Sequence, residues 1–152
     1  KERGIDGLVW AISPNSMSSE FGKWEDRYPG DEYVDIVGLD CYCPTYQAQP
    51  EAFSTFRSDI SNCLGSLQTF AENHGKILAV TETGYEGLTY DKWWTKILAP
   101  AIEGFPIAYL LVWRNTDEMP RGMTHFYAPW PGGPSEQDFK ELVDNGKLKL
   151  LK

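Results

Sequence analysis

The chain has 152 residues, of which 41% are hydrophobic, and its formal net charge at pH 7 is −8. This length suffices for one domain with a hydrophobic core. The acidic balance argues against a nucleic acid or an anionic membrane surface as the partner, because both attract basic faces. No apolar run approaches the roughly 20 residues that span a bilayer. No signal peptide opens the chain and residue 1 is lysine, so we expect a segment of a longer protein.

Aromatic residues make up 14% of the chain, with six Trp, eight Tyr and seven Phe. Aromatic faces cover the apolar faces of sugar rings, so this surplus suits a carbohydrate site, but it equally suits an aromatic core. Three cysteines, Cys41, Cys43 and Cys63, form no disulfide framework, and we expect buried thiols. The two histidines lie far apart in sequence, which argues against a metal site.

Four apolar runs predict strands at residues 7–12, 33–39, 77–80 and 107–112. None of them alternates between apolar and polar residues, so we expect strands covered on both faces. Helical spacing of apolar residues predicts helices at 18–28, 50–74, 90–103 and 135–143. Pro100 predicts a kink or break in the third helix, and residues 116–134 form a long predicted loop.

The resulting order alternates strand and helix four times, which predicts an α/β fold with a parallel sheet and right-handed crossovers. Two architectures fit this order. One is a small, complete, doubly wound sheet. The other is a partial (β/α)8 barrel made of four consecutive units, since a full barrel needs roughly 250 residues.

Polar residues follow each predicted strand, at the edge where α/β folds carry out their chemistry. Glu82 comes directly after the buried run 77–80, and a structural, hydrogen-bonded glutamate is the alternative to a catalytic one. The same strand parity predicts that Val80 and Glu82 share a face. The other residues at strand exits are Ser13, Asp40, Tyr42, Trp113, Arg114 and Asn115.

This set of residue types suits the hydrolysis of sugars. A carboxylate such as Glu82 can attack or stabilise an anomeric carbon, and the phenol of Tyr42 can hold that carboxylate by a hydrogen bond. An indole such as Trp113 can stack on a pyranose, while Arg114 and Asn115 can bind hydroxyl groups.

Three segments, residues 35–42, 79–84 and 111–115, resemble glycoside hydrolase family 26, and in particular its β-mannanases. Residues 28–31 and 125–132 also match this family. The resemblance implies that residues 1–152 are the C-terminal half of a (β/α)8 barrel, with the four predicted strands as strands 5 to 8. It implies no metal and no organic cofactor, and it implies an extracytoplasmic location for the parent protein.

The resemblance also implies roles for residues in the cleavage of internal β-1,4-mannosidic bonds of mannans by double displacement. Glu82 matches the nucleophile and Tyr42 matches a tyrosine that hydrogen-bonds it. Trp113 matches an aromatic platform flanked by Arg114 and Asn115, and we add Asp40 to these substrate-binding residues.

The sequence departs from the family pattern at the acid/base residue. The family carries it in a His-Glu motif followed by tryptophans, and no such motif occurs here. Asp40 and Glu86 are candidate substitutes, but a loop-fixing aspartate and a solvated glutamate are the more common explanations of such residues. We therefore expect little hydrolysis by this chain alone and a missing N-terminal half-barrel as its partner. A half-barrel also leaves two open sheet edges and an uncovered interior face, so we expect self-association.

Other function classes remain open at this stage. A carbohydrate-binding module without chemistry would bind glycans independently of Glu82. A barrel glycosidase acting on another β-1,4 glycan would share the same residues. A small hydrolase of doubly wound fold is disfavoured, because the sequence has no G-x-S-x-G motif and no phosphate-binding glycine loop.

Overall fold

A computed structural model describes residues 7–15, 23–44, 49–116, 125–146 and 148–150. Its main sheet contains four parallel strands in the order β1-β2-β3-β4. The strands are β1 (Ala11–Ile12), β2 (Ile36–Cys43), β3 (Ile77–Tyr85) and β4 (Leu110–Val112). The predicted parallel α/β sheet is therefore confirmed. The outer strands β1 and β4 are shorter than predicted, and β3 continues five residues past the predicted end at Val80.

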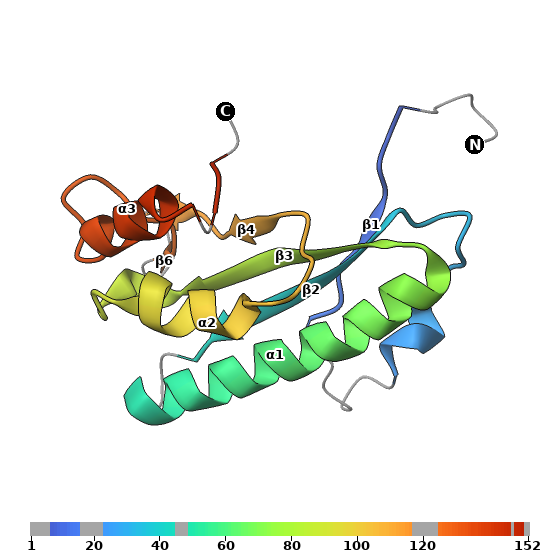
Figure 1. Cartoon of the computed structure of the whole chain (residues 1–152), viewed down its shortest axis with the longest axis horizontal. Helices are drawn as coiled ribbons and strands as arrows, with labels where there is room; N and C mark the ends of the chain where they lie inside the picture. Colours follow the sequence, from blue (N-terminus) through green and yellow to red (C-terminus); the bar gives the residue numbers. More distant parts are fainter. Residues whose placement is uncertain (1–6, 16–22, 45–48, 117–124, 147, 151–152) are drawn as a thin grey trace.

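Helices connect the strands and lie on one face of the sheet (Figure 1). The helix α1 (Gln49–His74) follows β2, and a π-helix η4 (Trp94–Leu98) continuing into α2 (Ala99–Ile102) follows β3. The helix is not broken at Pro100: it continues through this residue and changes from π to α at Ala99. One stretch of π-helix ends at Leu98, shortly before Pro100, whose ring removes one backbone N–H donor from the helix.

The remaining helices are short. Residues 16–22 lie outside the described residues, so the predicted helix 18–28 is seen only as the 3-10 helix η2 (Trp24–Arg27), whose Trp24 is buried. After β4, the helix α3 (Glu136–Asp144) begins beyond Ser135, the predicted N-cap. The Ser135 hydroxyl does not cap this helix but accepts a hydrogen bond from Trp94 Nε1 at 3.0 Å.

The core lies between the sheet and the helical layer. On β2, every second residue from Val37 to Cys43 is buried against α1. The facing residues of α1, at helical spacing, are Phe56, Ile60, Leu64 and Leu67, each at most 1% exposed. The three cysteines are free thiols, and the prediction that they are buried is confirmed for Cys41 and Cys43 but not for Cys63, which is partly exposed. Burial raises the pKa of both buried thiols to about 12.

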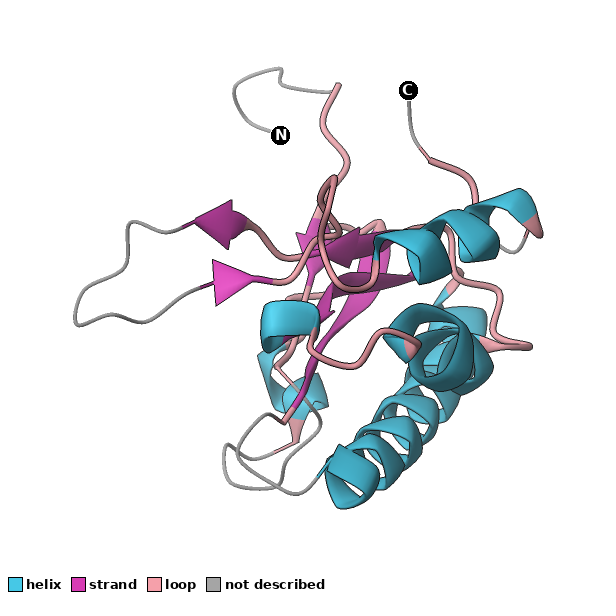
Figure 2. Cartoon of the chain, turned by 90° about the vertical axis from the view of Figure 1, so that its left-hand side faces the viewer, coloured by secondary structure: helices cyan, strands magenta, loops and turns pink. Residues whose placement is uncertain are grey.

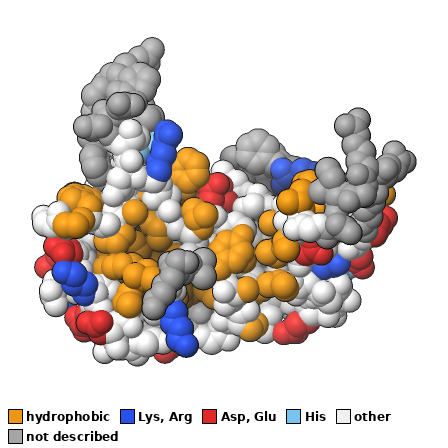
Figure 3. All heavy atoms as spheres, turned by 90° about the horizontal axis from the view of Figure 1, so that it is seen from above, with side chains coloured by type: hydrophobic (Ala, Val, Ile, Leu, Met, Phe, Trp, Pro, Cys, Tyr) orange, Lys and Arg blue, Asp and Glu red, His pale blue; other side chains and the backbone are white. Residues whose placement is uncertain are grey.

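The face of the sheet opposite α1 is not covered by the described residues, so the prediction of strands covered on both faces is wrong. Ile77 and Leu111 lie on this face and are 49% and 44% exposed. Viewed from this side, hydrophobic side chains gather in the middle of the molecule (Figure 3). We call this open surface the inner face.

Part of the predicted loop 116–134 is instead a second, two-stranded sheet. The strands β5 (Asn115–Thr116) and β6 (His125–Phe126) pair in antiparallel register. This pair stands beside the main sheet (Figure 2). Residues 117–124, which connect the two strands, lie outside the described part of the chain.

Candidate active site

A bulge in β3 brings Glu82 to the inner face. The register pairs Leu39 with Val80 and then Asp40 with Glu82, so Thr81 is an extra residue in β3. Val80 consequently packs into the core with Leu39, whereas Glu82 faces the other way, beside Asp40. The prediction that Val80 and Glu82 share a face is therefore wrong, because a bulge changes the alternation of side chains.

Thr81 itself also points to the inner face, and Gly38 makes room for it. A β-carbon on Gly38 would lie 2.2 Å from Thr81 Cγ2. The Thr81 hydroxyl forms a hydrogen bond with the hydroxyl of Ser13, which follows β1. This bond links the segment after β1 to β3, and Thr81 lies over Gly38 of the strand between them.

Tyr42 donates a hydrogen bond to Glu82, with 3.0 Å between the phenol oxygen and Oε2. Both side chains are partly buried at the carboxyl ends of their strands. Burial and the hydrogen bond to Glu82 raise the pKa of the Tyr42 phenol well above its usual value. The phenol therefore remains a proton donor at physiological pH, and its hydrogen bond fixes the orientation of the Glu82 carboxyl group.

Asp40 lies next to Glu82 in the register and differs from it in its surroundings. Burial, followed by the negative charge of Glu82, raises the pKa of Asp40 to about 6. Its Oδ1 atom is buried and has no hydrogen-bond partner among the described residues. Such an atom gains most from a ligand that donates a hydrogen bond, and sugar hydroxyl groups do so.

The residues after β4 surround the same sheet edge. The backbone N–H of Trp113 donates to the carbonyl of Thr83 at 3.1 Å, which places Trp113 one strand away from Glu82. The guanidinium carbon of Arg114 lies 5.7 Å from the centroid of the Trp113 ring, in a cation–π contact.

Asn115 makes a contact that the sequence does not predict. Its amide nitrogen donates to the carbonyl of Ala128, and its carbonyl oxygen accepts from the N–H of Ala128, at 2.8 and 2.9 Å. This pair of bonds fastens the segment after β6 to β5. Binding of sugar hydroxyls by Asn115 stays a prediction.

Tyr127 belongs to this site and was not singled out from the sequence. Its ring lies 5.4 Å from the Tyr42 ring in an edge-to-face contact. It fills the space over Gly84, where a β-carbon would lie 2.5 Å from Tyr127 Cδ1. A usable signal did exist, since a glycine two residues after a strand-end carboxylate leaves room for another side chain on the same face.

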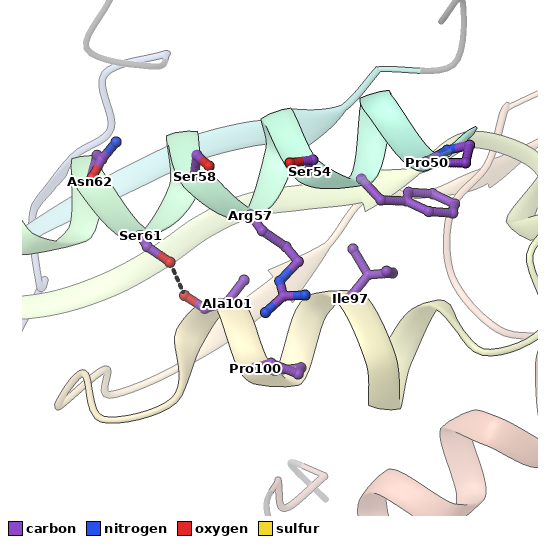
Figure 4. Close-up of a pocket in the computed structure, with 10 residues that line it drawn as sticks. Pro50, Ser54, Arg57, Ser58, Ser61, Asn62, Ile97, Pro100 and Ala101 are labelled. Atoms are coloured by element: carbon purple, nitrogen blue, oxygen red, sulfur yellow. Dashed lines mark hydrogen bonds between the residues drawn. The ribbon is translucent and has the colours of Figure 1, made fainter. Parts of the chain in front are cut away.

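A separate groove of about 590 Å³ lies on the helical layer, between α1 and η4–α2 (Figure 4). Arg57 points into it from α1, and Ser61 donates a hydrogen bond to the carbonyl of Ala101 at 2.8 Å. No residue that lines this groove is a carboxylate. The groove therefore lacks the groups that glycoside hydrolysis requires, and the strand-end cluster is the candidate active site.

Within the described ranges, no group of three or more His, Cys, Asp or Glu side chains could hold a metal ion. None of the helices seen there combines the length and the apolar character that crossing a membrane requires.

A parallel sheet of β/α units with a carboxylate at a strand end is typical of α/β barrel enzymes, and this chain is part of such a barrel. The family model described as "Glycosyl hydrolase family 26" matches residues 1–95. The chain belongs to glycosyl hydrolase family 26. The matched range includes Asp40, Tyr42 and Glu82.

Known proteins agree with this assignment. A β-mannanase structure from Bacteroides ovatus superposes with a TM-score of 0.82 and 36% sequence identity, over 96% of this chain and 40% of that one. The mannan endo-1,4-beta-mannosidase of Bifidobacterium adolescentis is 28% identical over 95% of this chain and 15% of its own length. A mannan endo-1,4-beta-mannosidase from Bacillus subtilis is 32% identical over 65% of this chain and 28% of its own. This chain thus spans less than half the length of each of these relatives.

Proposed function

We propose that this chain carries the nucleophile of a retaining mannan endo-1,4-β-mannosidase. The observation that supports the proposal most directly is the hydrogen bond from Tyr42 to Glu82 at the carboxyl ends of two adjacent parallel strands. The family membership and the similarity to mannanases support the choice of reaction and of substrate.

In this proposal Tyr42 holds Oε2 of Glu82 and leaves Oε1 to react. Oε1 attacks the anomeric carbon of a mannosyl unit, the bond to the leaving oxygen breaks, and an acid supplies that oxygen with a proton. Water then attacks the same carbon, and the bond to Glu82 breaks. The donation by Tyr42 stabilises the carboxylate both as the nucleophile and as the leaving group of the second step.

The remaining residues bind the polysaccharide. Trp113 offers an aromatic face to a sugar ring, and Arg114 and Asn115 supply donors for its hydroxyl groups. Asp40 accepts a hydrogen bond from a hydroxyl group through its buried Oδ1, which no described residue satisfies. Because mannan is a polymer too large to enter a cell intact, we place the complete enzyme outside the cytoplasm.

The acid comes, in this proposal, from the rest of a barrel of which these strands are strands 5 to 8. The inner face, with Ile77 and Leu111 exposed, would then be one wall of the barrel interior. Asp40 is a weaker candidate for the acid, because it belongs to the strand next to Glu82 on the same wall. Without the other half-barrel, we expect the isolated chain to hydrolyse little mannan and to associate with itself.

The proposal is tested by Glu82→Ala in the full-length protein that carries this chain. We expect loss of mannan hydrolysis by several orders of magnitude, and recovery with azide that yields a mannosyl azide of α configuration, the sign of a missing retaining nucleophile. Glu72→Ala, which removes an exposed carboxylate of α1, is the matched control. Undiminished hydrolysis by Glu82→Ala, or loss without azide rescue, would overturn the assignment of the nucleophile.

A further inference from the structure

We infer that Tyr127 is a positioning residue, which holds the Tyr42 ring in the orientation that lets its phenol bond to Glu82. This inference rests on the proposed function and adds a residue to the same site. Tyr127 touches no reacting atom in this account and acts through Tyr42.

The first argument is the order of contacts. The Tyr127 ring meets the Tyr42 ring with 5.4 Å between centroids and 69° between planes, which is a favourable edge-to-face geometry. The Tyr42 phenol in turn bonds to Glu82. Rotation about its Cα–Cβ bond moves the phenol oxygen of a tyrosine between several rotamers unless neighbouring atoms restrict it. The Tyr127 ring packed against Tyr42 therefore limits the positions that the Tyr42 phenol oxygen can occupy.

The second argument is that Gly84 leaves space on the inner face, and that the Tyr127 ring fills it. Gly84 is paired with Tyr42 in the register, so any side chain at residue 84 would lie on the inner face beside Tyr42. The Tyr127 ring occupies that space, since a β-carbon on Gly84 would fall 2.5 Å from Cδ1 and 3.1 Å from Cβ of Tyr127.

The third argument is that contacts of the residues before and after Tyr127 in the chain hold it in place. His125, two residues earlier in β6, packs edge-to-face against its ring at 5.7 Å. Ala128, the next residue, is tied to Asn115 by two hydrogen bonds. The phenol of Tyr127 makes no hydrogen bond to any described residue, so the ring and not the hydroxyl group makes the contacts that position Tyr42.

The test compares Tyr127→Phe with Tyr127→Ala in the full-length enzyme. Tyr127→Phe keeps the ring, and we expect kcat on mannan within about twofold of the wild type. Tyr127→Ala removes the ring, and we expect a roughly tenfold lower kcat with little change in KM. Equal losses in both variants would overturn the inference, because they would assign the effect to the hydroxyl group. Tyr33→Ala, an exposed tyrosine before β2, controls for the loss of a tyrosine as such.

A double-mutant cycle separates positioning from a general loss of structure. In a Tyr42→Phe background no phenol remains to be oriented, so adding Tyr127→Ala should change kcat by less than about twofold. A further tenfold loss in that background would overturn the inference.

The environment of Tyr42 can also be measured by NMR without any catalysis, and this measurement tests the inference whether or not the proposed function is correct. In protein labelled with ¹³C at tyrosine Cζ, the Tyr42 signal is assigned by its absence in Tyr42→Phe. We expect this signal to move in the same direction in Glu82→Gln and in Tyr127→Ala, and to stay in place in Tyr127→Phe. A Tyr42 signal that Tyr127→Ala leaves unmoved would refute the positioning role even in a protein that hydrolyses no mannan. Failure of the proposed function itself would be seen as a wild-type protein without mannan hydrolysis.

Discussion

Thr81 lies against Gly38 so closely that a β-carbon on Gly38 would stand 2.2 Å from Thr81 Cγ2 and 2.6 Å from Thr81 Oγ1. Thr81 is the extra residue of the bulge that turns Glu82 to the inner face. The absence of a side chain at residue 38 is therefore a condition for the present geometry of the candidate active site.

We expect Gly38→Ala to lower the free energy of unfolding by about 1–3 kcal/mol, because the new methyl group displaces Thr81 inside a packed sheet. The neighbouring Glu82 should move with it, so mannan hydrolysis by the full-length enzyme should fall as well. Urea unfolding and a kcat measurement check the two effects. Gly65→Ala is the matched control, since nothing lies within 4 Å of a β-carbon there. In the middle of α1 it should stabilise the protein by about 0.5–1 kcal/mol.

Asp40 should make the stability of the protein depend on pH. Its pKa of about 6 exceeds the ordinary value of 3.8, so between these pH values the folded protein holds a proton that the unfolded chain has released. The free energy of unfolding therefore falls as pH rises from about 4 to 6. Because the carboxyl group is partly exposed, we expect the effect to be about 1 kcal/mol.

Asp40→Asn removes this titration. The variant should become more stable relative to the wild type as pH rises through this window, and the difference should stay constant above pH 7. Urea unfolding of both proteins at pH 4, 5, 6 and 7.5 measures it. A difference that does not change with pH would contradict the assignment.

The buried Asp138 should be important for stability and not for chemistry. It is 1% exposed and accepts hydrogen bonds from the backbone N–H and the hydroxyl of Thr95, at 3.0 and 2.5 Å. Asp138→Ala leaves these donors of the π-helix η4 without an acceptor, so we expect a loss of about 2–4 kcal/mol in the free energy of unfolding.

Glu141→Ala is the matched control for Asp138→Ala, because both carboxylates lie within 4 Å of Lys92. Glu141 is exposed, so its ion pair with Lys92 should contribute little to stability. Thermal unfolding of the two variants distinguishes the buried hydrogen bonds from the surface charge. Similar melting temperatures for both would show that the bonds to Thr95 contribute little.

The isolated 152-residue chain should associate at micromolar concentration, because its inner face exposes apolar side chains and β1 and β4 are open edges. Light scattering measures its mass. Replacing Ile77 and Leu111 by lysine should shift the chain toward the monomer. A monomer formed already by the unmodified chain would contradict the expected association. Galactomannan hydrolysis at rates typical of an intact enzyme would contradict the expected low activity of the isolated chain.

The elements that could be predicted from the sequence are those whose apolar residues recur at a regular spacing. The predicted helix 50–74 differs from α1 by one residue, because its apolar spacing and the His74-Gly75 stop are local features. The placement of Glu82 at a strand end was also predictable. A hydrogen bond from Tyr42 was expected both from the meeting of strand exits at one sheet edge and from the family resemblance, although it joins residues 40 positions apart.

Neither the bulge at Thr81 nor the identity of Tyr127 as the neighbour of Tyr42 could be predicted from the periodicity of the sequence. A prediction from alternation assumes that each residue of a strand pairs with one residue of the neighbouring strand. Nothing in the amino-acid sequence of residues 79–84 marks Thr81 as an extra, unpaired residue. The β5–β6 pair, which carries Tyr127 to the site, has strands of two residues each, too short for any periodic signal. The open inner face followed from the half-barrel interpretation and not from the strands themselves, because apolar strands look alike whether helices or another part of a barrel cover them.

The extra residue in β3 shifts the alternation of its side chains by one position. The core residues before it are Leu78 and Val80, and those after it are Thr83 and Tyr85. Deleting Thr81 would restore the regular alternation of β3 and leave Glu82 opposite Asp40 on the inner face, but it would remove the side chain that lies over Gly38 and bonds to Ser13. A single codon deletion there should therefore lower activity less than loss of the Glu82 carboxylate.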